Sequence, residues 1–203
     1  NIVIAAKSDE PNPKLEGTIH SVAREVEEAG GQALAIKVDV RSEEDVDNLI
    51  AKTVERFGGI DAIINNAGAI ALAGVESTPL KKLDLMMQVN FRAVFLLSQK
   101  ALPYLKKSDN PHILSLCPPL DMDRRWLRNH SPYTLTKYGM SMLTLGMSDE
   151  FKRYGISVNA LWPRTVIHTA ATSFGGKQSF DRARSPLIMA DAAHTLLQTS
   201  ARE

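Results

Sequence analysis

The sequence contains a single cysteine, Cys117, in 203 residues. One thiol excludes a disulfide within the chain and is typical of proteins from a reducing compartment, so we expect a cytoplasmic location. The five histidines show no metal-ligand spacing with one another or with Cys117. We therefore expect no metal site in this protein.

An excess of charge of one sign is absent as well. The 24 Lys and Arg against 23 Asp and Glu give a formal net charge of +1. Basic pairs such as Lys81-Lys82 and Arg124-Arg125 are short and scattered, as on solvated surfaces, so we expect no nucleic-acid partner. The sequence also lacks an apolar run long enough for a membrane span.

Two glycine patterns are missing. The nucleophile elbow of hydrolases, Gly-x-Ser-x-Gly, does not occur, and this excludes a generic α/β hydrolase. The dinucleotide-binding pattern Gly-x-Gly-x-x-Gly does not occur either. The pairs Gly30-Gly31 and Gly58-Gly59 come after helical patterns, where glycine ends a helix rather than opening one.

Short apolar runs alternate with longer helical patterns along the whole chain. The runs at 2–6, 33–38, 61–65, 112–116 and 156–161 predict strands, and the stretches at 18–29, 42–57, 79–107, 132–153 and 191–198 predict helices. Breaks are expected near Asn90 and Pro103. Near-continuous apolar strands between helices predict an α/β fold with a doubly wound, Rossmann-type parallel sheet covered by helices on both faces.

Tyr133 and Lys137 are four residues apart in the fourth predicted helix, so both side chains lie on one helix face. A phenol titrates near 10, too high for acid–base work at neutral pH. A nearby ammonium stabilises the phenolate and lowers that pKa. The pair could therefore transfer a proton to or from a carbonyl or alcohol oxygen.

The order of polar features along the chain is more specific than this pair alone. Asp39 ends the second predicted strand, Asn66-Ala67-Gly68 follows the third, and Asn90 precedes Tyr133-x-x-x-Lys137. The run Val158–Pro163 closes the series. This order resembles the short-chain dehydrogenase/reductase family over nearly the whole chain.

The resemblance implies a catalytic set. Tyr133 would be the general acid/base, and Lys137 would lower its pKa and bond the nicotinamide ribose. Asn90 would position the lysine through a water molecule and relay protons. The plainer alternative for Asn90 is a polar residue at a helix kink.

The resemblance also implies a cofactor site. Asn66-Ala67-Gly68 would line the adenosine side, Asp39 would bond the adenine amino group, and Pro163 and Thr169 would lie near the nicotinamide and pyrophosphate. Alternatively, Asp39 caps the next helix. Lys7 follows the first predicted strand, and a cation there suits a 2′-phosphate, which favours NADP(H) over NAD(H); its alternative is a solvated lysine.

One departure from the family concerns its catalytic serine. Pro118 occupies that position, and proline has no hydroxyl with which to bond a substrate oxygen. Ser115, Cys117 and Ser131 are the nearby substitutes, with Cys117 better explained as a small core residue. The expected function is an NADP(H)-dependent oxidoreductase that interconverts a carbonyl and a secondary alcohol. The alternative is a catalytically weak nucleotide-binding or scaffold protein on the same fold.

The remaining expectations concern the domain, the substrate and the assembly. We interpret residues 1–203 as one incomplete nucleotide-binding domain, with the first strand and its glycine-rich loop upstream of Asn1 and a last strand beyond Gln198. A lipid-like small-molecule substrate is suggested if the apolar residues Trp126, Met140, Met142, Trp162 and Phe174 line a pocket, and the alternative is that they belong to the core. The segment 172–184 is placed to act as a lid. The resemblance also implies a homodimer or homotetramer formed through the helices at 83–107 and 132–153, with contacts from Ala93, Leu97, Ala101, Met142, Leu145 and Gly146. The alternative is that these residues only pack on the sheet.

Overall fold

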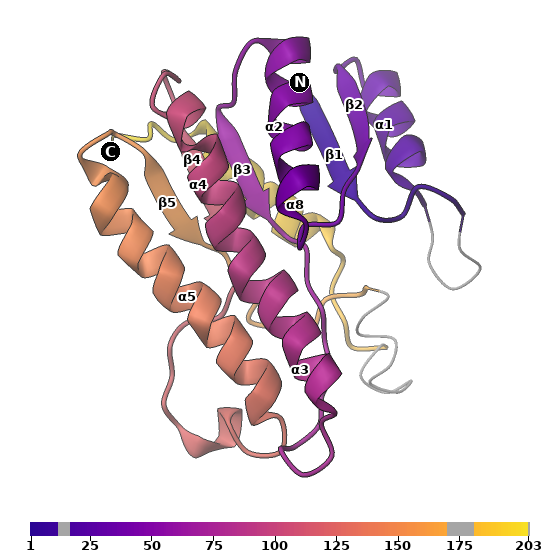
Figure 1. Cartoon of the computed structure of the whole chain (residues 1–203), viewed down its shortest axis with the longest axis vertical. Helices are drawn as coiled ribbons and strands as arrows, with labels where there is room; N and C mark the ends of the chain where they lie inside the picture. The colour runs from indigo at the N-terminus through magenta and orange to yellow at the C-terminus, as the bar shows by residue number, and fades with distance from the viewer. Residues whose placement is uncertain (12–16, 170–180, 203) are drawn as a thin grey trace.

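The computed structural model of the chain describes residues 1–11, 17–169 and 181–202. Its strands are β1 (Ile2–Ala6), β2 (Ala33–Lys37), β3 (Ala62–Asn65), β4 (His112–Ser115) and β5 (Ser157–Ala160). Its α-helices are α1 (Ile19–Glu28), α2 (Glu43–Phe57), α3 (Leu80–Met86), α4 (Ala93–Leu105), α5 (Ser131–Lys152) and α8 (Leu187–Gln198). Two shorter helices are η1 (Met87–Arg92), a π-helix, and η2 (Arg124–Trp126), a 3₁₀-helix. Strands and helices alternate as the sequence predicted (Figure 1).

All strand pairs of the described residues are parallel, but they form two sheets. One has the order β1-β2 and the other the order β3-β4-β5. The register of the larger sheet aligns the carboxyl ends of its strands, with Asn65 opposite Ser115 and Ser115 opposite Ala160. The sequence analysis expected a single sheet, whereas the described strands form two sheets with no pairing between β1 and β3.

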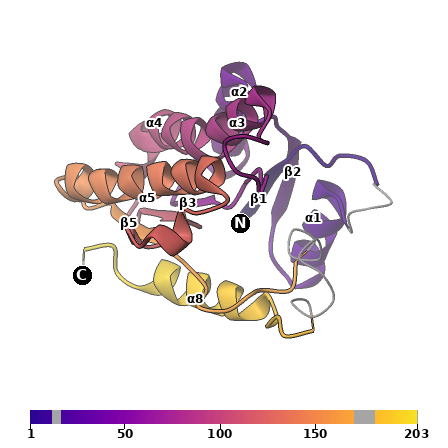
Figure 2. The same cartoon turned by 90° about the horizontal axis from the view of Figure 1, so that it is seen from below.

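Helices cover both faces of the strands (Figure 2). Helices α2, α3, α4 and α5 lie on one side, and α1 and α8 lie on the other. This arrangement confirms the doubly wound α/β class. None of the helices in the described ranges is long and apolar enough to cross a membrane.

The helix ends follow from their cap residues. The Thr18 hydroxyl accepts a hydrogen bond from the Ser21 amide at the start of α1, and the Ser42 hydroxyl accepts one from the Asp45 amide at the start of α2. Gly58 ends α2 with a φ of 84°, a left-handed conformation that favours glycine.

The main core lies between the β3-β4-β5 sheet and helices α4 and α5. Ile113, Met140 and Ala101 are fully buried there. A smaller cluster of Ile36, Val38 and Leu49 joins β2 to α2. The burial of these apolar side chains is the main source of stability for the fold.

Three details of the helices differ from or refine the sequence prediction. The break near Asn90 is the π-helix η1, a form that often marks functional sites. Pro103 does not break α4, since it is exposed near the helix end and removes only one helical hydrogen bond. Helix α8 begins at Leu187, directly after Pro186, and not at Asp191. The greater part of the expected lid, 172–180, lies outside the described residues.

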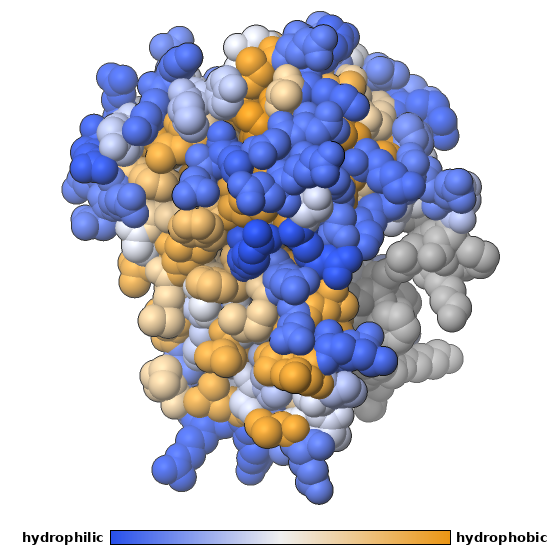
Figure 3. Space-filling model, in the orientation of Figure 1, coloured by the Kyte–Doolittle hydropathy of each residue, from blue (hydrophilic) through white to orange (hydrophobic). Residues whose placement is uncertain are grey.

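The outward faces of α4 and α5 carry apolar side chains. Exposed fractions are 49% for Phe95, 61% for Leu135, 62% for Met142 and 65% for Leu145. Apolar surface gathers over these helices in the left half of Figure 3. The prediction that Ala93 and Ala101 belong to this face is wrong, because both are buried within the chain.

Candidate active site

Tyr133 and Lys137 lie one turn apart near the start of α5, and both are half-buried. Burial raises the pKa of the Tyr133 phenol and lowers the pKa of the Lys137 ammonium, because it disfavours the charged form of each. The Lys137 Nζ donates to the Leu116 carbonyl at 2.6 Å. The lowered tyrosine pKa expected from the sequence is therefore not what the structure shows.

Asn90 connects the loop after β3 to the helix that carries Tyr133. Its Oδ1 accepts from the Ala69 amide at 2.8 Å, and its Nδ2 donates to the Ala69 carbonyl and to Thr136 Oγ1, both at 2.9 Å. Thr136 in turn donates to the Tyr133 carbonyl at 2.8 Å. Because the buried amide is bonded in this way, only the main chain of Asn90 is left to hold a water molecule for Lys137.

One face of α5 holds the loop between β4 and α5. Four side chains spaced as helix neighbours donate to four loop carbonyls. Thr134 donates to Trp126, Lys137 to Leu116, Tyr138 to Asp121 and Ser141 to Pro118, over 2.5–2.8 Å. The loop that carries Pro118 is thereby positioned by the same helix as Tyr133.

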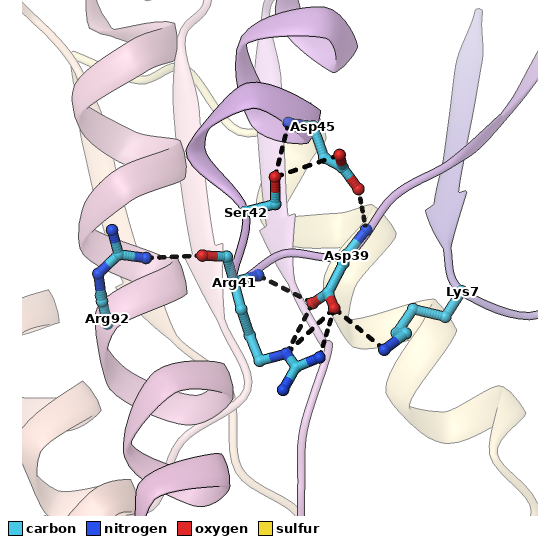
Figure 4. A network of polar contacts seen from close by, with 6 residues as sticks. All are labelled: Lys7, Asp39, Arg41, Ser42, Asp45 and Arg92. Carbon is cyan, nitrogen blue, oxygen red and sulfur yellow. Dashed lines mark hydrogen bonds and ion pairs between the residues drawn. The ribbon is translucent and has the colours of Figure 1, made fainter.

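A second group of charged residues lies beyond the ends of β1 and β2 (Figure 4). The Asp39 carboxylate pairs with Lys7 at 3.0 Å and with the Arg41 guanidinium at 2.5 Å. These cations, with Arg41 contributing most, hold the pKa of the Asp39 carboxyl well below its usual range. The structure thus brings Lys7 and Asp39 together, whereas the sequence analysis gave them separate roles. The cap of α2 is Ser42 rather than Asp39.

The other predicted cofactor residues lie near the carboxyl ends of the larger sheet. Asn66, Ala67 and Gly68 are exposed directly after β3. Pro163 is half-buried after β5, and Thr169 is exposed at the edge of the described residues. In doubly wound folds ligands bind outside these strand ends.

Comparison with known proteins decides the family. A family model described as short chain dehydrogenase matches residues 13–178. The chain belongs to the short-chain dehydrogenase family.

The chain is similar to members of this family from several organisms. It is 51% identical over 199 residues to hydroxysteroid dehydrogenase-like protein 2 of Danio rerio, covering 98% of this chain and 48% of that protein. It is also 51% identical to a putative dehydrogenase from Xanthomonas campestris, with a TM-score of 0.95 and coverage of 98% and 74%. A gluconate 5-dehydrogenase from Burkholderia cenocepacia, solved with NADP and tartrate, shares 25% identity at a TM-score of 0.79, with coverage of 98% and 78%. The chain thus spans about half the length of the curated relative.

The candidates for the family's serine differ in exposure. Ser115 and Cys117 have no exposed surface, and the Ser115 hydroxyl accepts a hydrogen bond from Asn65 at 3.2 Å. Their burial argues against direct contact between either side chain and a substrate oxygen. Ser131 and Pro118 are half-buried, so Ser131 is the better placed of the three hydroxyl or thiol candidates.

The apolar residues proposed to line a substrate pocket do not share one environment. Met140 is fully buried in the core, whereas Trp126 and Trp162 are about half exposed, at 47% and 49%. Phe174 lies outside the described residues. A shallow cavity of about 330 Å³ is lined by Pro118, α5 and β5, but neither Tyr133 nor Lys137 reaches it. We do not assign it to the dehydrogenase substrate.

The sequence analysis did not identify two residues of this candidate site. Thr136 joins Asn90 to α5, and Arg41 holds Asp39. Thr136 lies inside the Tyr-x-x-x-Lys motif but has no spacing signal of its own. The position of Arg41 two residues after Asp39 was a usable signal, since such neighbours bond readily in a loop.

Proposed function

We propose that the full-length protein is an NADP(H)-dependent oxidoreductase that interconverts a carbonyl and a secondary alcohol, with Tyr133 as general acid/base. The observation that carries the proposal is the bonded chain from Ala69 through Asn90 and Thr136 to the Tyr133 carbonyl. This chain fixes the tyrosine helix against the strand ends where ligands of such folds bind.

The residues present fit a phosphorylated dinucleotide. Lys7 offers a cation beyond β1, and the Lys7 side chain is 64% exposed, so a 2′-phosphate has access to it. The exposed stretch Asn66–Gly68 presents backbone without bulky side chains at the next strand end. The NADP bound to the related gluconate 5-dehydrogenase supports the same cofactor class for this chain. A bound nicotinamide cofactor supplies or accepts the hydride.

The protein's own residues handle the proton. The Tyr133 phenol is protonated at neutral pH, because its ordinary pKa is near 10 and burial raises that pKa further. A protonated phenol is the form that donates a proton to a developing alkoxide. Lys137 supplies the nearest positive charge on the same helix face, and an ammonium there stabilises the phenolate left after transfer. Asn90 and Thr136 keep the helix in position during the exchange.

Pro118 favours a second candidate function. With proline at the family's serine position and Ser115 buried, the substrate oxygen would lack one hydrogen-bond donor. A nucleotide-binding protein with little turnover would tolerate that loss. The two candidates differ in catalytic rate and agree on cofactor binding.

We further propose that the full-length protein self-associates through the exposed faces of α4 and α5. Phe95, Leu135, Met142 and Leu145 supply the apolar contact surface. Surfaces of this kind on neighbouring helices mark protein–protein interfaces more often than isolated exposed side chains do.

The cofactor assignment is tested by titrating NADPH and NADH against the full-length protein and its Lys7→Glu variant. Wild type is expected to bind NADPH about tenfold or more tightly than NADH, because a charge-assisted bond to the phosphate contributes at least this much. Lys7→Glu should remove the preference. Equal affinities for both cofactors in both proteins would refute the assignment.

A further inference from the structure

The Asp39 carboxylate accepts hydrogen bonds from Arg41 and from Lys7, and the two residues differ in how many bonds they donate. Its Oδ1 accepts from the Arg41 amide at 3.1 Å and from Arg41 Nε at 2.9 Å. Its Oδ2 accepts from Arg41 Nε at 3.1 Å, Arg41 Nη2 at 2.5 Å and Lys7 Nζ at 3.0 Å. Arg41 therefore donates hydrogen bonds to both carboxylate oxygens, whereas Lys7 donates one hydrogen bond to one of them (Figure 4).

The surroundings make Arg41 the fixed partner and Lys7 the exchangeable one. The Lys7 side chain is 64% exposed against 36% for Arg41, and a single exposed lysine bond is weak. The backbone of Arg41 is held as well, because Arg92 Nη1 donates to its carbonyl at 2.9 Å. A planar guanidinium bonded to both oxygens also fixes the direction of a carboxylate in a way that a lysine does not.

The difference between Arg41 and Lys7 in their bonds to Asp39 affects how a phosphorylated cofactor would bind. This inference rests on the proposed function. A bound 2′-phosphate would draw Lys7 away from Asp39. The carboxylate then needs a remaining counter-charge, both to keep its orientation toward the adenine amino group and to limit its repulsion of the phosphate. Arg41 is the residue of the described network that can supply this charge.

We propose that Arg41 is a positioning residue for the adenosine half of the cofactor. It holds Asp39 in place whether or not Lys7 is bound to it. Lys7 then distinguishes NADPH from NADH, whereas Arg41 supports the binding of both. A nucleotide without nicotinamide or a 2′-phosphate, such as 5′-AMP, depends on Arg41 in the same way.

The test is calorimetric titration of NADPH, NADH and 5′-AMP against the full-length protein and its Arg41→Gln variant. The affinity for NADH and for 5′-AMP is expected to fall about tenfold, and that for NADPH by at least as much. Arg41→Lys keeps the positive charge but cannot bond both carboxylate oxygens as a guanidinium does. It should therefore recover only part of the affinity that Arg41→Gln loses. Arg24→Gln, on the exposed face of α1, removes one positive charge outside the network and should change nothing.

A double variant separates positioning from a general structural effect. In an Asp39→Asn background, Arg41→Gln should cause no further loss, because both changes act on the same carboxylate. Losses that add would overturn the proposal, and so would an unchanged NADH affinity in Arg41→Gln. A loss confined to NADPH would instead place Arg41 on the phosphate. A wild-type protein that binds neither dinucleotide would overturn the proposed function itself.

Discussion

Pro118 is the residue that the sequence analysis placed at the position of the family's catalytic serine. Its carbonyl accepts the Ser141 hydroxyl at 2.6 Å, so the loop is held in place although the position offers no donor side chain. Removing one donor from a developing oxyanion typically costs about 3–4 kcal/mol. Under the proposed function, we expect the residue at this position to affect the rate of turnover.

Substitution of Pro118 by serine tests its effect on turnover. If no other side chain replaces the missing donor, Pro118→Ser should raise turnover of a reactive diketone on the order of 10²-fold. The exposed neighbour provides a control, since Pro119→Ser should leave the rate unchanged. The contrary outcome is a wild-type rate in Pro118→Ser together with loss of activity in Ser131→Ala, which would make Ser131 the donor.

At the residue scale the sequence did not predict several of the contacts that the structure shows. Lys7 and Asp39 were chosen as cofactor residues, and their mutual ion pair was not foreseen because 32 residues separate them in the chain. The expected effect of Lys137 on the Tyr133 pKa was not found. Spacing on a helix fixes which side chains are neighbours, but not that a loop carbonyl will bind the ammonium.

Helix α5 is the element that organises the site. It carries Tyr133 and Lys137, binds four carbonyls of the loop to β4, and meets Asn90 through Thr136. Thr136 has no exposed surface. Its hydroxyl is both acceptor and donor, so its loss leaves one Asn90 N–H without this partner.

We predict that Thr136→Val lowers the free energy of unfolding by about 1–3 kcal/mol, the cost of an unsatisfied buried donor. Urea unfolding monitored by circular dichroism gives this value. The matched control is Thr144→Val, because Thr144 is also buried in α5 and donates to Met140 in its own helix, and its replacement leaves no amide donor unpaired. An equal fall in the free energy of unfolding in the two variants would show that the hydrogen bond to Asn90 adds nothing to stability.

The elements themselves were largely predictable. Apolar runs located all five strands of the described chain, and Ser42 and Gly58 marked the two ends of α2. The π-helix at Asn90 was foreseen only as a break, since nothing in the local sequence separates a π-turn from a kink. The start of α8 was missed because Pro186, which precedes it, was not recognised as a helix-start signal.

At the scale of the whole molecule, the outward faces of α4 and α5 carry exposed apolar side chains. The exposed side chains Leu135, Met142 and Leu145 recur at helix spacing along α5, and this repeat supports the proposed association of two copies. The sequence analysis expected α4 and α5 to carry this surface and included the buried Ala93 and Ala101 in it, because periodicity alone does not say which helix face is buried.

Leu145→Glu should therefore shift the full-length protein toward monomer in sedimentation velocity at micromolar concentration. A buried charge at an apolar contact is costly, whereas the same charge on a free surface is not. Leu72→Glu is the control, with an equally exposed leucine at 66% in the loop after β3. A monomeric wild type, or equal behaviour of the two variants, would contradict the proposed interface.

The central claim is that Tyr133 transfers the proton in a carbonyl–alcohol interconversion. The most direct measurement compares turnover and NADPH affinity of Tyr133→Phe and Tyr138→Phe in the full-length protein. Tyr138 lies on the same helix, but its hydroxyl donates to the Asp121 carbonyl at 2.5 Å. We predict that Tyr133→Phe lowers turnover on the order of 10²–10⁴-fold with NADPH affinity nearly unchanged, while Tyr138→Phe retains most of the rate. Wild-type turnover in Tyr133→Phe would contradict the account.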